Sequence, residues 1–144
     1  MTTPTERRRA LRWMAETLQD LGADPLAPEK IKREAEELLA AWPGQSDVAS
    51  CFLEMPEEKL GGVLEAICRG QELLEQASCC RSLDPKTKRA VQATARHFPQ
   101  AWELPAGREK PLLPRAWIDL YLLRDVDHAD LAREIESIRA EGSG

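Results

Sequence analysis

Two stretches of the chain follow one pattern, and this internal repeat constrains the fold more than any other feature. Residues 26–43 and residues 83–99 both open with Leu-x-Pro, continue through Lys-x-Lys-Arg, and stop at an aromatic residue followed by proline. A longer amphipathic helical pattern precedes each stretch. Proline is tolerated in the first turn of a helix and cannot continue one. The repeat therefore predicts two αα-hairpins, each a long helix followed by a shorter one.

The first hairpin starts at a clear helix signal. Thr3 is expected to cap the helix, Pro4 suits its first position, and Glu6 completes a capping box. The shorter helix of this hairpin ends its apolar stripe at Trp42, which we expect in the core. Along the longer helix, apolar residues recur three or four positions apart and so share one face: Ala10, Leu11, Met14, Leu18 and Leu21.

The second hairpin, about residues 56–99, repeats this plan with smaller side chains. Gly61 and Gly62 weaken the first turns of its long helix, by roughly 1 kcal/mol per glycine relative to alanine. We expect this pair to mark the close approach of a neighbouring helix, with a functional hinge as the alternative. Phe98 ends the shorter helix and is the predicted equivalent of Trp42, with both rings buried.

A proline-rich connection, residues 99–114, leads into two C-terminal helices predicted over residues 114–141. Trp102 lies in this connection, and long connections are often functional. The first of the two helices contains Trp117 and Tyr121 and is apolar on every side. Such a helix is either buried centrally between the hairpins or presents one side to a partner. Because Trp and Tyr are enriched at binding hot spots, we place a partner-binding surface at Trp102, Trp117 and Tyr121.

Together these patterns predict an all-α fold, with two repeated αα-hairpins in a helical bundle and a C-terminal helix pair. The first repeat covers about residues 3–44. The 144 residues, 42% of them apolar, suffice for a core, so we assign residues 1–144 to one helical domain. No apolar run approaches the ~18–20 residues of a membrane span, and no signal-peptide pattern opens the chain. We expect a cytoplasmic protein without membrane contact.

Candidate ligands and nucleophiles are scattered along the chain. Four cysteines fit no zinc spacing, and we expect them to be reduced and metal-free: Cys51, Cys68, Cys79 and Cys80. The densest ligand-like cluster is Asp125, Asp127, His128 and Asp130. It lacks the glycine and distal glutamate of a calcium loop, and helix capping explains it. We expect no catalytic residue, no metal and no cofactor, although an enzyme assembled from scattered residues stays open as an alternative.

The first helix carries a basic patch near its N-terminus: Arg7, Arg8, Arg9 and Arg12. Cations there oppose the helix dipole at about 0.3–1 kcal/mol each, so they are not there for helix stability. Two interpretations stay open, namely contacts with nucleic-acid phosphates or an acidic partner, or a solvated face paired with glutamates. The formal net charge of −5 argues against nucleic acid. Trp13, on the flank of the apolar face, is either an edge residue or a contact point.

Three stretches near the N-terminus carry a resemblance to known proteins: Thr3-Pro4-Thr5-Glu6-Arg7-Arg8-Arg9-Ala10, Leu38-Leu39-x-x-Trp42-Pro43 and Ser46-Asp47-Val48. They resemble a family of short uncharacterised proteobacterial proteins, over about the first 50 residues. Trp42 stands where the family more often has tyrosine. The resemblance implies a bacterial or phage-borne origin and implies no activity.

These observations favour a non-enzymatic protein–protein interaction module, because such a module needs only a surface. An adaptor, an immunity factor or a phage-borne inhibitor of a host system would fit, and a homodimer is compatible with each. The alternative is a nucleic-acid-binding regulator that uses Arg7, Arg8 and Arg12. A salt-dependent gel shift separates the two, because phosphate binding weakens steeply with salt.

Overall fold

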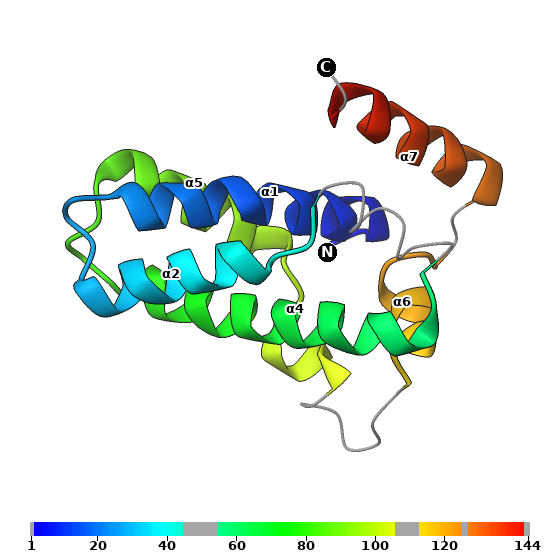
Figure 1. Ribbon diagram of the computed structural model, residues 1–144, viewed down its shortest axis with the longest axis horizontal. Coiled ribbons are helices and arrows are strands. Elements are labelled where there is room, and N and C mark those ends of the chain that lie inside the picture. The colour runs from blue at the N-terminus through cyan, green and yellow to red at the C-terminus, as the bar shows by residue number, and fades with distance from the viewer. Residues whose placement is uncertain (1, 45–54, 106–112, 125–126, 143–144) are drawn as a thin grey trace.

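The computed structural model describes residues 2–44, 55–105, 113–124 and 127–142. In these ranges the chain is helical and contains no strand, which confirms the all-α prediction (Figure 1). The elements are α1 (Pro4–Ala23), α2 (Glu29–Ala41), α4 (Glu57–Ser78), α5 (Pro85–His97), the short 3-10 helix η1 (Ala101–Glu103), α6 (Pro114–Tyr121) and α7 (His128–Gly142).

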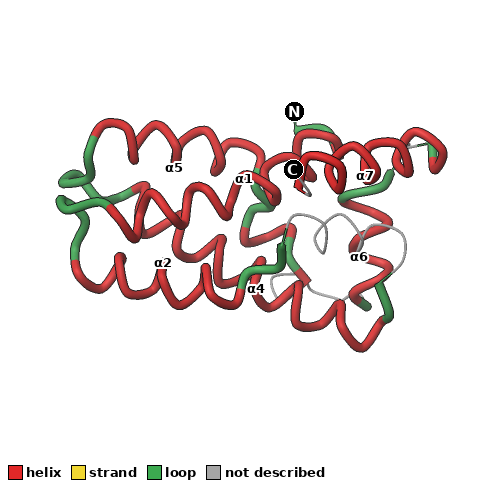
Figure 2. The backbone as a smooth tube through the Cα atoms, turned by 45° about the horizontal axis from the view of Figure 1, so that its top comes forward, coloured by secondary structure: helices red, strands yellow, loops and turns green. Residues whose placement is uncertain are grey.

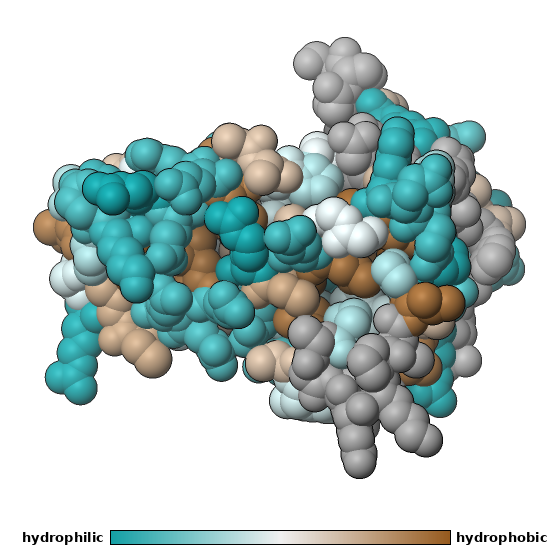
Figure 3. All heavy atoms as spheres, turned by 60° about the horizontal axis from the view of Figure 1, so that its bottom comes forward, coloured by the Kyte–Doolittle hydropathy of each residue, from teal (hydrophilic) through white to brown (hydrophobic). Residues whose placement is uncertain are grey.

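Four of these helices form a packed bundle. α1 packs against both α2 and α5, and α4 packs against the same two helices. Consecutive helices run in opposite directions, so short turns suffice to join α1 to α2 and α4 to α5 (Figures 1 and 2). η1 and α6 pack against α4, while α7 lies beyond the bundle, near the N-terminal end of α1. On the face seen in Figure 3, hydrophilic side chains cover much of the bundle and hydrophobic atoms show between them.

Local signals set the helix ends as the sequence predicts. The Thr3 hydroxyl accepts the backbone N–H of Glu6 at 3.2 Å, and the Glu6 carboxylate accepts that of Thr3 at 3.0 Å. This is the predicted capping box of α1. Asp84 caps α5 by accepting the backbone N–H of Lys86 at 2.9 Å.

Asp24 ties together the two turns at the other end of the bundle. Its side chain is buried, and its carboxylate accepts the backbone N–H groups of Leu26 at 2.8 Å and Asp84 at 2.9 Å. Burial disfavours the charged carboxylate, but these hydrogen bonds outweigh it and hold the pKa of Asp24 below its ordinary value of 3.8. The turn after α1 is thereby fixed to the start of α5.

The buried positions of the bundle recur at a constant interval of 56 residues, as Ala10 and Ala66 illustrate. In α1 they are Arg8, Ala10, Leu11, Met14, Thr17, Leu18 and Leu21. The residues 56 positions later are also buried: Leu64, Ala66, Ile67, Gly70, Leu73, Leu74 and Ala77. Ile31, Ala35, Leu38 and Trp42 match Thr87, Val91, Thr94 and Phe98 in the same way. A single register therefore relates most of the buried positions of the two halves, although Leu60, Val63 and Gln71 of α4 are buried without a buried counterpart in α1.

Trp42 and Phe98 are buried, as predicted, and their ring centroids lie 6.4 Å apart. Beneath them, a Cβ placed on Gly70 would lie 3.3 Å from atoms of Met14, Trp42 and Phe98. Gly70 is thus a point of close helix approach. The expectation that the Gly61-Gly62 pair has this role is wrong. Both glycines sit in the exposed early turns of α4, where a Cβ would meet no described atom within 4 Å.

These two environments predict opposite effects of the same substitution. Glycine to alanine in an exposed helix favours folding by up to about 1 kcal/mol, and we expect this gain from Gly61→Ala. Overpacking a filled core costs typically about 1–3 kcal/mol, so we expect Gly70→Ala to lose about 1 kcal/mol net. Urea unfolding of both variants measures the two free energies. Equal stabilisation by the two substitutions would contradict the packing at Gly70.

Candidate functional site

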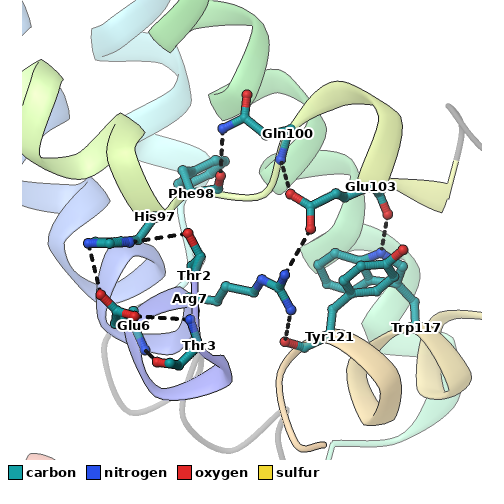
Figure 4. A network of polar contacts seen from close by, with 10 residues as sticks. All are labelled: Thr2, Thr3, Glu6, Arg7, His97, Phe98, Gln100, Glu103, Trp117 and Tyr121. Atoms are coloured by element: carbon teal, nitrogen blue, oxygen red, sulfur yellow. Dashed lines mark hydrogen bonds and ion pairs between the residues drawn. The ribbon is translucent and has the colours of Figure 1, made fainter.

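Arg7 connects α1 to the C-terminal part of the chain. Its guanidinium donates to the carbonyl oxygen of Tyr121 at 3.1 Å and to Oε2 of Glu103 at 3.0 Å (Figure 4). It also lies over the Tyr121 ring, 5.2 Å from the ring centroid. One side chain of α1 therefore contacts both η1 and the end of α6.

Glu103 is the centre of this network. It is 7% exposed. Its second carboxylate oxygen accepts the backbone N–H of Gln100 at 3.0 Å and so closes a capping box on η1. Its carbonyl oxygen accepts the indole N–H of Trp117 at 2.7 Å. The Trp117 ring in turn stacks on Tyr121 with a centroid separation of 5.4 Å (Figure 4).

The three aromatic residues chosen from the sequence differ in exposure. Trp117 is fully buried, and Tyr121 is half-buried behind it. Trp102, on η1 beside Glu103, is 70% exposed. α6 packs against α4 and lies outside the bundle of α1, α2, α4 and α5, and Leu120 is 38% exposed (Figure 1). Only Trp102 among the three presents most of its ring to solvent.

Arg8 and Arg12 fasten α7 to α1. Both guanidinium groups pair with Glu134, each at 2.9 Å, and Arg8 also donates to the carbonyl oxygen of Leu122 at 2.7 Å. Burial disfavours the ionised form of Glu134, but the two arginines outweigh it and hold the pKa of Glu134 below its ordinary value of 4.5. The sequence left open contacts with phosphates or an acidic partner, or a solvated face paired with glutamates. In the structure both arginines pair with a glutamate of the same chain, Glu134.

Arg9 faces a different direction, into a groove between α1 and α5. The groove has a volume of about 390 Å³. Trp13 lines it and is 42% exposed, with the Arg9 guanidinium 5.7 Å from its ring centroid. α5 contributes Arg89 and Arg96. Sequence reasoning singled out Trp13 but missed the groove. The available signal was Arg9 one helical turn before Trp13, with Arg89 and Arg96 two turns apart.

The remaining candidate ligands form no metal site in the described part of the chain, where no three His, Cys, Asp or Glu side chains are arranged to hold an ion. Cys68, Cys79 and Cys80 carry free thiols, whereas Cys51 and Asp125 lie outside the described residues. Asp127 accepts the backbone N–H of Ala129 at 2.7 Å, as the capping interpretation predicts. The helices in the described ranges include none long and apolar enough to cross a membrane.

Comparison with protein-family models, with characterised proteins and with solved structures finds no match for this chain. The resemblance of the first 50 residues to a proteobacterial family therefore stays a prediction.

The position of α7 is predicted to depend on pH through Glu134. Its pKa is lower in the folded chain than its ordinary 4.5. Its stabilising contribution is therefore complete above that value and is lost as the pH falls through the folded pKa. At neutral pH, Glu134→Gln should weaken the attachment of α7 by about 2 kcal/mol, because hydrogen bonds to charged groups contribute roughly that much.

Hydrogen exchange of the α7 amides measures this attachment. The difference between the wild-type chain and Glu134→Gln should shrink as the pH falls through the folded pKa of Glu134, which lies below 4.5, because the wild-type carboxyl then becomes protonated as well. Glu136→Gln, an exposed position on the same helix, serves as the control. Equal protection of α7 in wild type and Glu134→Gln at neutral pH would refute the role given to Glu134.

Proposed function

We propose that the chain is a non-enzymatic protein–protein interaction module, acting as an adaptor, an immunity factor or a phage-borne inhibitor of a host system. The observation that carries the proposal is Trp102, which exposes 70% of its surface on an element fixed from behind. Tryptophan is enriched at binding hot spots. A large ring held on a rigid support contacts a partner with little loss of conformational entropy.

The support for Trp102 comes from its neighbour Glu103. The Glu103 side chain caps η1 and pairs with Arg7, and its carbonyl oxygen accepts the Trp117 indole N–H. η1 packs against α4 as well. In this proposal Trp102 contacts the partner, while Trp117 and Tyr121 act as positioning residues behind it.

The bundle itself is proposed to consist of two repeated αα-hairpins, followed by a C-terminal helix pair. The recurrence of buried positions at an interval of 56 residues supports this organisation. Trp42 and Phe98 support it too, because each follows the last residue of its helix, α2 or α5, with an extended backbone conformation. In this scheme the hairpins build the scaffold, and α6 and α7 are additions held by the arginines of α1.

The nucleic-acid reading of the N-terminal arginines has less support. Arg7 pairs with Glu103, and Arg8 and Arg12 pair with Glu134. Contact with phosphates would require these arginines to leave their carboxylates, which would remain partly buried without a counter-charge.

Trp102→Ala is predicted to separate binding from folding. Because the ring is mostly exposed, its loss should change the free energy of unfolding by at most about 0.5 kcal/mol. Trp117→Ala should instead cost about 3–5 kcal/mol, the usual range for a buried aromatic residue. Urea unfolding measures both values.

Binding is tested with a photo-crosslinking residue in place of the exposed Ala101, which leaves Trp102 intact, using extract from the native host. The proposal predicts a discrete cross-linked protein that Trp102→Ala binds at least about tenfold more weakly. Leu26→Ala, which removes a side chain 52% exposed in the turn after α1, is the matched control and should bind normally. Retention of full binding by Trp102→Ala would reject Trp102 as the contact residue.

A further inference from the structure

The groove between α1 and α5 combines exposed positive charge with an exposed aromatic ring. Arg9 and Trp13 enter it from α1, and Arg89 and Arg96 enter it from α5. All four residues are exposed. None of the residues that support Trp102 lines this groove. Binding in the groove is therefore independent of the contact proposed at Trp102.

The three arginines of the groove differ from the other arginines of α1. Arg7, Arg8 and Arg12 each pair with a carboxylate of the same chain. Among the described residues, Arg9, Arg89 and Arg96 form no ion pair. Glu6 is the carboxylate that lines the groove, and it already contacts His97 at 3.0 Å and the backbone N–H of Thr3. The groove therefore offers positive charge that no carboxylate of the described residues pairs with.

The positive charge of the α1/α5 groove is not a consequence of how the helices pack, because a second groove, between α2 and α4, is lined differently. It occupies the corresponding place in the bundle, since Trp13 and Arg69 lie 56 residues apart, as do Glu37 and Ala93. Its charged lining is mainly acidic, with Glu34, Glu37 and Glu72 around Arg69. Two grooves built on the same register thus carry opposite charge, and only the α1/α5 groove contains a tryptophan.

We propose that the α1/α5 groove docks an acidic amphipathic helix of a partner protein. An apolar side chain of that helix packs on Trp13, and its carboxylates pair with Arg9, Arg89 and Arg96. Arg89 and Arg96 are seven residues apart, which is about 10 Å along a helix. Carboxylates two turns apart on the incoming helix match this spacing, and helix-in-groove docking is a recurrent mode of recognition.

The charge distribution selects an acidic peptide over a nucleic acid. Proteins that bind duplex DNA commonly neutralise about 6–10 phosphates. The groove presents only three arginines, Arg9, Arg89 and Arg96, on a chain whose formal net charge is −5. A short acidic segment binds in the groove and ends there. A nucleic acid would extend beyond the groove and be repelled by the acidic rest of the surface.

The test uses the full chain and a fluorescently labelled stapled helix with the pattern Glu-x-x-Leu-Glu-x-x-Glu. Fluorescence anisotropy measures its affinity, with a lysine-substituted version of the peptide and a duplex DNA of 12 base pairs as competitors. Arg89→Glu combined with Arg96→Glu should weaken binding at least about tenfold, and Trp13→Ala about tenfold. Lys86→Glu changes the same kind of charge at an exposed position of α5 that does not line the groove, and should have less than about a twofold effect.

Circular dichroism checks that each variant is folded. We expect every variant to fold, because the substituted side chains are exposed. The proposal is overturned if the lysine peptide binds as tightly as the glutamate peptide, or if Arg89→Glu with Arg96→Glu binds like wild type. It is also overturned if the duplex displaces the glutamate peptide at lower concentration than unlabelled peptide does, because the groove would then be a phosphate site.

Discussion

The packing of three side chains against Gly70 fixes how the four bundle helices come together. Met14 comes from α1, Trp42 closes α2 and Phe98 closes α5, and each places an atom 3.3 Å from the position of a Cβ on Gly70. All four helices therefore meet at one point. Met14 and Gly70 are 56 residues apart, as are Trp42 and Phe98. At this position α1 has the long side chain of Met14 and α4 has the bare backbone of Gly70, so the two helices pack closely without a steric clash.

The C-terminal third depends in turn on the arginines of α1. α6 spans only eight residues, and a helix this short is marginal without tertiary contacts. Arg7 and Arg8 donate to the carbonyl oxygens of Tyr121 and Leu122, at the end of α6 where backbone acceptors lack intrahelical partners. Cations that oppose the dipole of α1 thereby complement that of α6.

Sequence reasoning succeeded where the determinants are local. Thr3 and Glu6 form their capping box within one turn, and the apolar spacing identified the buried faces that include Trp42 and Phe98. It did not identify partners distant in the chain. Arg7 and Glu103 are 96 positions apart, and Arg8 and Glu134 are 126 apart. Gly70 was overlooked for the same reason, because a glycine at a helix crossing has no local signature that distinguishes it from exposed Gly61.

Helical periodicity explains how one basic run on α1 serves separate purposes. Successive residues turn by roughly 100° about the helix axis. Arg8 and Arg12 are therefore only about 40° apart, and both reach Glu134. Arg9 points roughly 100° away from Arg8, toward α5, with Trp13 one turn further along the same side. Residues adjacent in sequence thus hold the fold together on one side of α1 and leave positive charge exposed on another. The internal pairing of Arg7, Arg8 and Arg12 explains why counting arginines in the sequence overstates the charge available to a partner.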